Sequence, residues 1–214
     1  MKKTIVSNYE RLNDEWAKRI SGMDIDGLMK KLPELKREGD CLTIRHFARK
    51  YAMSLENFAI AAAEDDLPVT SNARLNIYTL LWYSREGAAL TGDFKPFESL
   101  RGAGPFGPAF KKGVLAPFAA AFSGRTEALL QACEVLGGRR LNISDAGFEL
   151  SAFDCIPVRY YFWDGDEEFP AQANMLFDMS CTDFIHVESI VTIATEGMRR
   201  IAEAAGVSLD RSAF

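Results

Sequence analysis

The sequence predicts an α+β fold in which strands and helices occupy separate parts of the chain. In the C-terminal half, four extended segments follow one another with no helix between them, at residues 139–143, 147–153, 157–163 and 171–177. Strands joined directly in this way pair antiparallel, so we expect a four-stranded antiparallel meander. Beyond it, apolar residues recur at steps of three and four: Phe184, Val187, Val191, Ala194, Met198 and Ile201. That spacing predicts a long final helix, capped by Gly206, that packs on the meander.

Length and composition indicate one globular domain. The chain has 214 residues, of which 48% are hydrophobic and 26% are charged. These are ordinary values for a folded protein, and a chain of this length buries about 70% of the surface that it exposes when unfolded. No repeat, low-complexity tract or long linker interrupts the sequence. We therefore expect residues 1–214 to form a single α+β domain.

The N-terminal part is expected to hold helices and a small hairpin. Residues 8–20 have helical spacing, and a second short helix is expected between a cap at Asp26 and Pro33. Residues 41–55 alternate apolar and polar side chains, which predicts two strands joined near Arg49 and Lys50. A helical turn over residues 57–63 and a loop over 64–71 are expected to follow.

Central helices are predicted over residues 72–83, 114–122 and 126–136. The segment 101–113 between them contains the pattern G-x-G-x-x-G at residues 102–107. Pro105 and Pro108 interrupt this pattern and no buried strand precedes it, which argues against a dinucleotide-binding fold. We expect a plain irregular loop, the alternative being an anion held by its turn amides with Arg101, Lys111 or Lys112.

The net charge of −5 is unevenly distributed, since the first 50 residues hold 12 basic and 8 acidic side chains. A basic face there could meet an acidic partner or a nucleic acid. No run of like charge in it exceeds two residues, so we interpret it as solvated surface and expect no nucleic-acid partner. Its members are Lys30, Lys31, Lys36, Arg37, Arg45, Arg49 and Lys50.

The cysteines and the apolar runs favour a cytoplasmic protein. Cys41, Cys133, Cys155 and Cys181 are scattered singly, without the spacing of a zinc or iron–sulfur site, and are expected to be buried thiols. The apolar run near the N-terminus is too short for a signal peptide. The longest non-polar stretch, residues 113–122, falls short of the roughly 20 residues that span a membrane. We expect no disulfide, no membrane partner and no resident cofactor.

Four carboxylates lie close together between the last two predicted strands, at Asp164, Asp166, Glu167 and Glu168. Asp-Gly between aromatic strands is a common hairpin signal, so these acids are typical of an exposed turn. Crowded carboxylates also attract a cation or a basic partner. A calcium loop of the EF-hand type is excluded, because its required glycine and final glutamate are replaced by Phe169 and Met175.

A second acidic group accompanies a histidine where the last helix is expected to begin. Asp178, Asp183, His186 and Glu188 could ligate a divalent metal or act as an acid–base pair. The alternative is structural: Ser180 and Asp183 form a capping pattern, and the histidine packs beside the core. We expect Glu188 to pair with Arg159 if it is buried.

Nucleophilic hydrolase signatures are absent from the sequence. No G-x-S-x-G occurs, and Cys181 lacks the surroundings of a catalytic cysteine. A helix start would lower the pKa of this thiol, but Asp178 and Asp183 would raise it. We expect the acids to dominate, so that the thiol is unreactive.

Five sequence blocks resemble one protein family. In order they read VLGGRRL, DAGFEL, SAFDCIPV, FWDGDEEFPAQANMLFDMS and DFIHVES. This order resembles the uncharacterised prokaryotic family named domain of unknown function thirty-seven eighty-six (DUF3786). The resemblance runs from residue 8 into the last helix and is most specific from Leu136 onward. The most recognisable positions are Gly165, Asp166, Glu168, Phe169, Pro170, Leu176, Phe177, Asp178 and Glu188.

What the resemblance implies about function is limited. Members of the family occur largely in anaerobic bacteria and archaea, and some carry an added cysteine-rich iron–sulfur domain. This chain lacks such a cysteine cluster, so it has no ligands of its own for an iron–sulfur centre. The family assigns no catalytic residue that could be transferred.

Three hypotheses follow. The first is a binding or accessory module in anaerobic metabolism that recognises a small ligand or a protein partner, such as a redox or iron–sulfur protein. Its predicted ligand residues are Tyr160, Tyr161, Trp163, Asp166, Glu168, Asp178 and Glu188. The second is a metal-assisted hydrolase or lyase that uses Asp178, Asp183, His186 and Glu188. The third makes the acidic turn a docking surface. The first two require the acids beside the last hairpin to converge with the start of the final helix.

Overall fold

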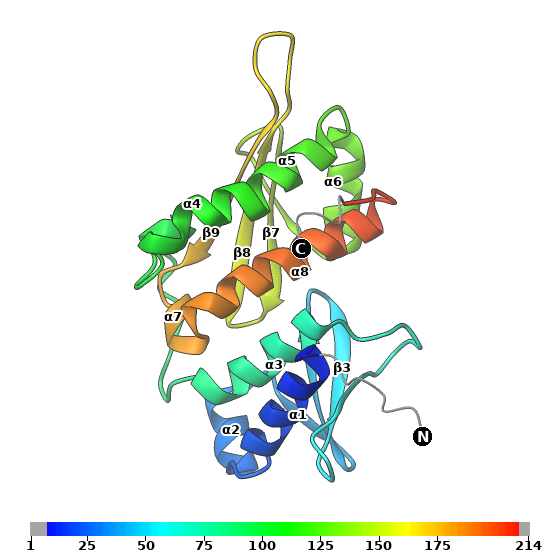
Figure 1. The fold of residues 1–214 in the computed structure, drawn as a ribbon, viewed down its shortest axis with the longest axis vertical. Coiled ribbons are helices and arrows are strands. Elements are labelled where there is room, and N and C mark those ends of the chain that lie inside the picture. Colours follow the sequence, from blue (N-terminus) through cyan, green and yellow to red (C-terminus); the bar gives the residue numbers. More distant parts are fainter. Residues whose placement is uncertain (1–7, 210–214) are drawn as a thin grey trace.

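The computed structural model describes residues 8–209, and the side chains from residue 12 onward. Figure 1 shows an elongated molecule with one β-sheet in each half. Helices α3 (Ser71–Tyr83) and α8 (Val187–Ala204) pack against each other where the halves meet. The predicted α+β class is confirmed, and each of the two sheets is larger than expected.

The first sheet is a meander in sequence order. Its strands are β1 (Lys36–Glu38), β2 (Cys41–His46), β3 (Arg49–Ser54) and β4 (Ile60–Ala62). The predicted hairpin is β2 and β3, joined at Phe47 and Ala48 instead of near Arg49 and Lys50. The helical turn expected over residues 57–63 is wrong, because residues 60–62 form β4. Helices α1 (Asn8–Ile20) and α2 (Ile25–Lys31) precede this sheet, and α1 packs on α3.

The second sheet has the strand order β5-β9-β8-β7-β6, all antiparallel. Its strands are β5 (Phe94–Pro96), β6 (Arg139–Leu141), β7 (Ala146–Phe153), β8 (Ile156–Trp163) and β9 (Gln172–Asp178). The last four are the predicted meander. Strand β5 was not expected, since Pro96 and only three residues give a weak strand signal, and it pairs with the free edge of β9.

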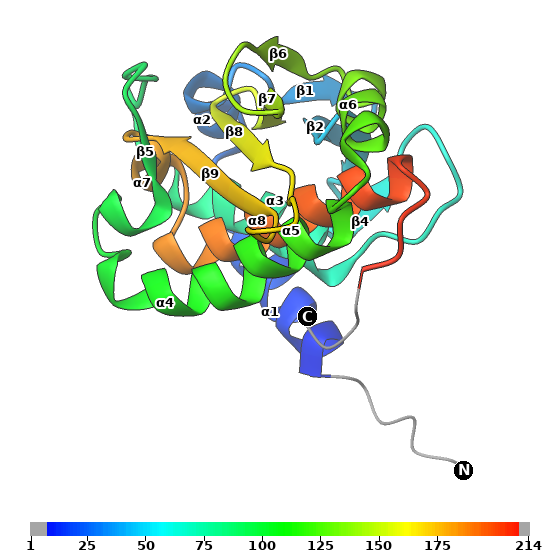
Figure 2. The ribbon, with the colours of Figure 1, turned by 90° about the horizontal axis from the view of Figure 1, so that it is seen from above.

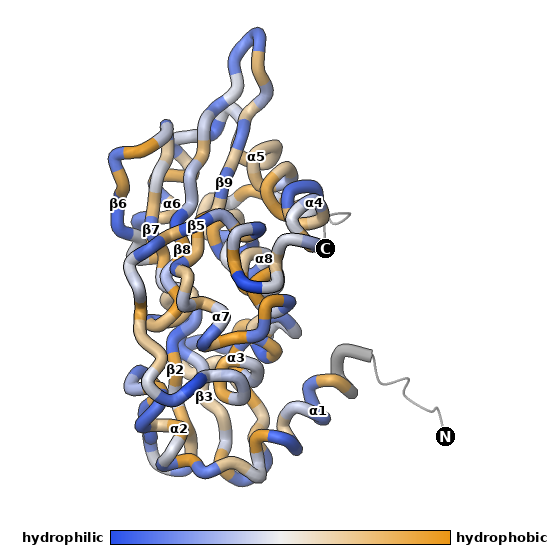
Figure 3. The backbone as a smooth tube through the Cα atoms, turned by 90° about the vertical axis from the view of Figure 1, so that its left-hand side faces the viewer, coloured by the Kyte–Doolittle hydropathy of each residue, from blue (hydrophilic) through white to orange (hydrophobic). Residues whose placement is uncertain are grey.

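Helices cover one face of the second sheet. Figures 2 and 3 show α4 (Gly107–Phe110), α5 (Ala116–Phe122) and α8 on the same side of β7, β8 and β9. Helix α6 (Thr126–Val135) packs on both α8 and β7. Within residues 8–209, no helix combines the length and the apolar character needed to cross a membrane.

The segment 101–113, predicted to be an irregular loop, is largely helical. A short 3₁₀ turn at Gly104–Phe106 leads into α4, and a π-helical turn at Lys111–Leu115 joins α4 to α5. Pro108 lies in the first turn of α4, where its missing N–H is not needed. Pro117 cannot donate to the carbonyl of Gly113, and the wider π turn lies directly before it.

The single final helix expected from residue 183 is two helices. Helix α7 (Cys181–Phe184) ends at Ile185, whose backbone is extended, and α8 begins after His186. Ile185 is 1% exposed, so burial of this side chain accompanies the break. Gly206 has a φ of 66° beyond the end of α8, as the predicted cap requires.

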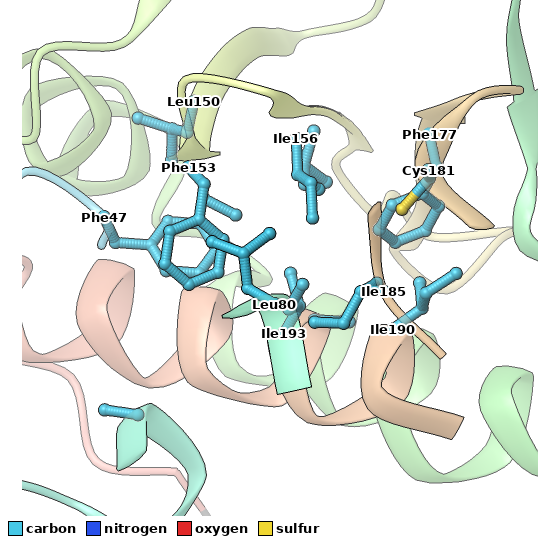
Figure 4. Packing of buried hydrophobic residues seen from close by; sticks show 14 of the residues in the cluster. Phe47, Leu80, Leu150, Phe153, Ile156, Phe177, Cys181, Ile185, Ile190 and Ile193 are labelled. Carbon is cyan, nitrogen blue, oxygen red and sulfur yellow. The ribbon is translucent and has the colours of Figure 1, made fainter. Parts of the chain in front are cut away.

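The core is continuous between the two halves. Figure 4 shows Phe47 from the β2–β3 turn and Phe153 from the second sheet beside Leu80 of α3 and Ile193 of α8. The amide of Phe47 also donates to the carbonyl of Ala152, at 3.1 Å. The tip of the β2–β3 hairpin is thus bonded directly to the second sheet.

Candidate functional site

The three aromatic residues of the predicted ligand site lie on opposite faces of β8. Tyr160 faces the helices, is 2% exposed, and has its hydroxyl against Gly197 of α8. Tyr161 and Trp163 share the other face because side chains alternate along a strand, and their rings are 6.2 Å apart. Only Trp163 is well exposed, at 40%. The structure therefore separates Tyr160 from the other two.

The acidic turn lies in a hairpin arm, residues 164–171, that extends beyond β8 and β9 (Figure 1). Asp166 closes the turn, since its Oδ1 accepts from the amides of Glu168 and Phe169, both at 2.8 Å. Asp164 accepts from the amide of Gly124 and the hydroxyl of Thr126, also at 2.8 Å. These hydrogen bonds lower the pKa of both aspartates. Two of the four acids thus accept hydrogen bonds from backbone amides.

Asp178 is buried at the other end of β9 and is saturated with hydrogen bonds. Its carboxylate accepts from the amide and hydroxyl of Thr91, the amide of Gly92, and the amide and hydroxyl of Ser180, at 2.6 to 3.0 Å. Burial opposes ionisation, but these donors outweigh it and hold the pKa of Asp178 at about 2. The carboxylate fastens the start of β5 to the end of β9.

The other members of the predicted metal group are engaged separately. Asp183 pairs with Arg85 at 3.0 Å and with Arg101 at 2.8 Å. His186 caps α8, its Nδ1 accepting from the amide of Glu188 at 3.4 Å. The Glu188 side chain is 71% exposed. The pairing with Arg159 was expected only of a buried Glu188, and Arg159 bonds Glu149 instead, at 2.8 Å.

The predicted convergence of these acids does not occur. The hairpin arm and the start of α8 lie at opposite ends of β9, whose seven residues span roughly 20 Å. Across residues 8–209, no group of three or more His, Cys, Asp or Glu side chains is placed to hold a metal ion. A ligand or metal role for the individual residues stays a prediction, without a shared site to support it.

A cleft of about 630 Å³ opens elsewhere, between the first sheet and the β7–β8 turn. We call it the inter-sheet cleft. Its walls come from the end of α2, strands β1 to β3, the connection after α3, the β7–β8 turn and α7. The lining residues are Lys31, Leu32, Pro33, Glu34, Lys36, Glu38, Thr43, Ile44, Arg45, Lys50, Ala88, Ala89, Leu90, Asp154, Cys155 and Phe184.

Glu34 is the most unusual residue of the inter-sheet cleft. Its Oε2 accepts from the amide of Cys155 at 3.2 Å, whereas its buried Oε1 has no hydrogen-bond partner among residues 8–209. Burial raises the pKa of Glu34, a hydrogen bond from Cys155 opposes this, and the charge of Asp154 adds to the rise. A carboxyl group that is partly desolvated inside a cleft is a typical binding or proton-transfer group.

The thiols of Cys155 and Cys181 are protonated rather than nucleophilic. Burial raises the pKa of Cys155, and the neighbouring Glu34 raises it further. Burial likewise raises the pKa of Cys181, with Asp178 adding to the effect. The expected direction for Cys181 is confirmed, although burial is the larger cause. All four cysteines are free, and Cys41 and Cys155 are only half-buried.

Comparison with known proteins identifies the family. Residues 29–200 match the family "Domain of unknown function (DUF3786)". The chain belongs to this family. No curated protein and no solved structure matches the DUF3786 chain. Every residue that lines the inter-sheet cleft lies within the matched DUF3786 region.

Sequence reasoning missed the inter-sheet cleft of this DUF3786 domain because its walls come from six separate segments. One local signal was present at Glu34, which lies between Leu32 and Leu35 after a proline. Both leucines are buried, at 1% and 2% exposure, and they carry the glutamate inward with them.

Proposed function

We propose that this DUF3786 domain is a binding module that takes a small molecule into the inter-sheet cleft. Ligand pockets typically measure about 300 to 1,000 Å³ and combine apolar walls with a few polar groups. The inter-sheet cleft, at about 630 Å³, has this size and composition. Leu32, Ile44 and Phe184 contribute apolar surface, and Glu34 supplies a carboxyl group.

The observation that carries the proposal is the unpaired Oε1 of Glu34. A buried polar atom without a partner is costly, and native proteins retain few of them. A ligand that hydrogen-bonds this carboxyl group would remove the cost. The proposal is for binding without covalent chemistry, because Cys155 beside Glu34 is held as a thiol and the thiolate is the nucleophilic form.

The accessory role in anaerobic metabolism, and a redox or iron–sulfur protein as partner, form the finer part of this proposal. Both rest on the family resemblance. The small molecule is the more specific expectation, because it has a cleft of suitable size in the structure.

A cleft-blocking variant tests the proposal. Ala89 is exposed and lines the inter-sheet cleft, so Ala89→Trp places an indole ring across it. Ala120→Trp on the exposed side of α5 is the matched control. Fluorinated fragments are screened against the three proteins by ¹⁹F NMR. We expect some fragments to bind both the wild type and Ala120→Trp but not Ala89→Trp. Thermal unfolding confirms that both variants fold. A screen in which no binder is lost from Ala89→Trp refutes the proposal.

A further inference from the structure

The positive charges of the inter-sheet cleft are not all neutralised. Lys31 and Lys36 form no ion pair with any residue in the range 8–209. Each bonds a backbone carbonyl instead, Lys31 that of Ser84 at 3.1 Å and Lys36 that of Pro33 at 2.7 Å. An ammonium group has three N–H donors. Each lysine therefore keeps donors for another partner.

The remaining cations of the inter-sheet cleft are paired. Lys50 bonds Glu38 at 2.8 Å, and Arg45 bonds Glu64, outside the cleft, at 2.7 Å. The two other acids in the lining are Asp154, which lies close enough to Glu34 for its charge to raise the pKa of that residue, and Glu34 itself, whose charged form is disfavoured by burial. The charges of the cleft that form no ion pair are thus those of Lys31 and Lys36 on one side of the balance and Asp154 and Glu34 on the other, and burial disfavours the charge of Glu34.

The two lysines flank Glu34 in the segment that joins α2 to β1. Lys31 ends α2 and Lys36 begins β1, so both are carried on ordered backbone. Lysine binds carboxylate and phosphate groups as a mobile point charge. The lining of the cleft also offers apolar surface from Ala88, Leu90 and Phe184.

We propose that the inter-sheet cleft selects molecules that join an apolar body to an anionic oxygen group, a carboxylate or a phosphate, which Lys31 and Lys36 hold beside the carboxyl group of Glu34. This inference rests on the proposed function and names the chemical class of the ligand. The Glu34 carboxyl group, when protonated, donates to the anion.

Binding of an anion beside Glu34 is linked to proton uptake. A second negative charge raises the pKa of a carboxyl group further. The charged and titratable groups that act on Glu34 are Asp154 and Cys155 from the β7–β8 turn. Lys31 and Lys36 line the same cleft from the segment that carries Glu34. Affinity for the anion is therefore expected to rise as the pH is lowered, and Glu34→Gln is expected to weaken this dependence.

Matched probes test the charge requirement. Benzoate and benzamide have nearly the same shape and differ in charge, and phenyl phosphate supplies the other anion. Isothermal titration at pH 7 and constant ionic strength is expected to give at least about tenfold tighter binding of an anion than of benzamide. Competition between phenyl phosphate and benzoate shows which group is preferred.

Two lysine variants and one control locate the site. Lys36→Met and Lys31→Met are each expected to weaken binding of the anion about tenfold. Arg37→Met is the matched control, because Arg37 is exposed, follows Lys36 in β1 and does not line the cleft. Circular dichroism confirms that each variant folds.

The outcomes separate this inference from the proposed function. Equal affinity for benzoate and benzamide, both lost in Ala89→Trp, refutes anion selection and leaves the cleft as a binding site. A loss in Arg37→Met as large as in Lys36→Met also refutes it, since the attraction would then be non-specific. Anion selection is also refuted if neither anion binds while uncharged fragments still occupy the cleft. Absence of any Ala89→Trp-sensitive binding refutes both.

Discussion

His46 is buried at the junction of the two halves, with 1% of its surface exposed. Its Nδ1 lies 2.7 Å from the carbonyl of Ala152, an acceptor, so Nδ1 carries the proton. Its Nε2 then accepts from the amide of Asn76, at 3.1 Å. Both ring nitrogens are satisfied in this neutral tautomer. A second proton on Nε2 would face the Asn76 amide hydrogens.

The stability of the protein should therefore depend on the protonation of His46. Burial lowers its pKa to about 4, Glu196 opposes this, and Arg200 and Arg199 assist it. The ordinary value is 6.5, so the unfolded chain binds the proton first as the pH falls. The contribution of neutral His46 to the free energy of unfolding is complete above pH 6.5 and is lost as the pH falls from 6.5 to 4. The loss amounts to about 3 kcal/mol.

Urea unfolding at a series of pH values measures this loss. His46→Gln should show a flatter stability profile than the wild type between pH 6.5 and 4. His186→Gln, at the exposed cap of α8, controls for the removal of a histidine. Parallel profiles for the wild type and His46→Gln would contradict the assignment.

Replacing Asp178 tests whether this predicted site residue has a structural role. Asparagine has one acceptor oxygen and an NH₂ group that would face the donors of Thr91, Gly92 or Ser180. Asp178→Asn should lower the free energy of unfolding by about 2–4 kcal/mol at pH 7. Asp93→Asn is the control, because Asp93 is exposed and its ion pair within residues 8–209 is with Lys95 alone. If Asp178→Asn is as stable as Asp93→Asn, the Asp178 carboxylate is not structural and is available for another role.

At the scale of elements, the hairpin tip between β2 and β3 depends on one glycine of α8. A Cβ atom at Gly197 would overlap the Tyr160 hydroxyl and lie 2.6 Å from the Phe47 ring. The tip is itself unusual, since Phe47 and Ala48 have φ values of 46° and 63°. Phe47 adopts this backbone because its ring is buried where the tip, α8 and β8 meet.

Gly197→Ala should consequently destabilise the protein by about 1–3 kcal/mol, because neither ring is free to move away. Gly113 provides the opposite case. It lies in the helical segment before α5, and nothing within 4 Å would meet an added Cβ. Gly113→Ala should raise stability by up to about 1 kcal/mol, the ordinary gain in a helix. Thermal unfolding compares the two, and a fall of similar size in both variants would refute the steric explanation.

The elements that the sequence predicts well are the longer ones, which contain many apolar residues. Strands β7, β8 and β9 and helices α3, α5 and α6 lie within a few residues of their expected ranges. Strands β1 and β4 were missed because they have three residues each and a weak apolar pattern. The Phe47–Ala48 turn was missed because it contains no Gly or Asn, the usual residues of such turns.

The candidate site was harder to predict than the fold. The acidic turn and the Asp178 group were conspicuous in the sequence, and the structure uses three of their aspartates to bond backbone amides. Glu34 was inconspicuous, because its meaning depends on Cys155, which is far away in the chain. Clusters along the sequence reveal local capping, whereas a cleft built from distant segments has no signature at any one of them.

At the scale of the whole molecule, polar as well as apolar groups connect the halves. His46 of the first sheet bonds Ala152 of the second, and through Asn76 of α3 it reaches Thr192 of α8. Nearby, Glu196 of α8 accepts from Thr70 before α3. These donors and acceptors are paired only when both halves are in place. Neither half can keep its buried polar groups paired alone.

We therefore predict that the two halves unfold together, as the single α+β domain expected from the sequence requires. Trp16 and Trp82 lie in the first half, with ring centroids 6.2 Å apart, and Trp163 lies at the end of β8 in the second. Fluorescence of Trp163→Phe reports the first half, and that of a Trp16→Phe/Trp82→Phe variant reports the second. In each variant, the urea midpoint measured by fluorescence should coincide with the midpoint measured by circular dichroism. Separate midpoints within one variant would show two folding units, with the inter-sheet cleft between them.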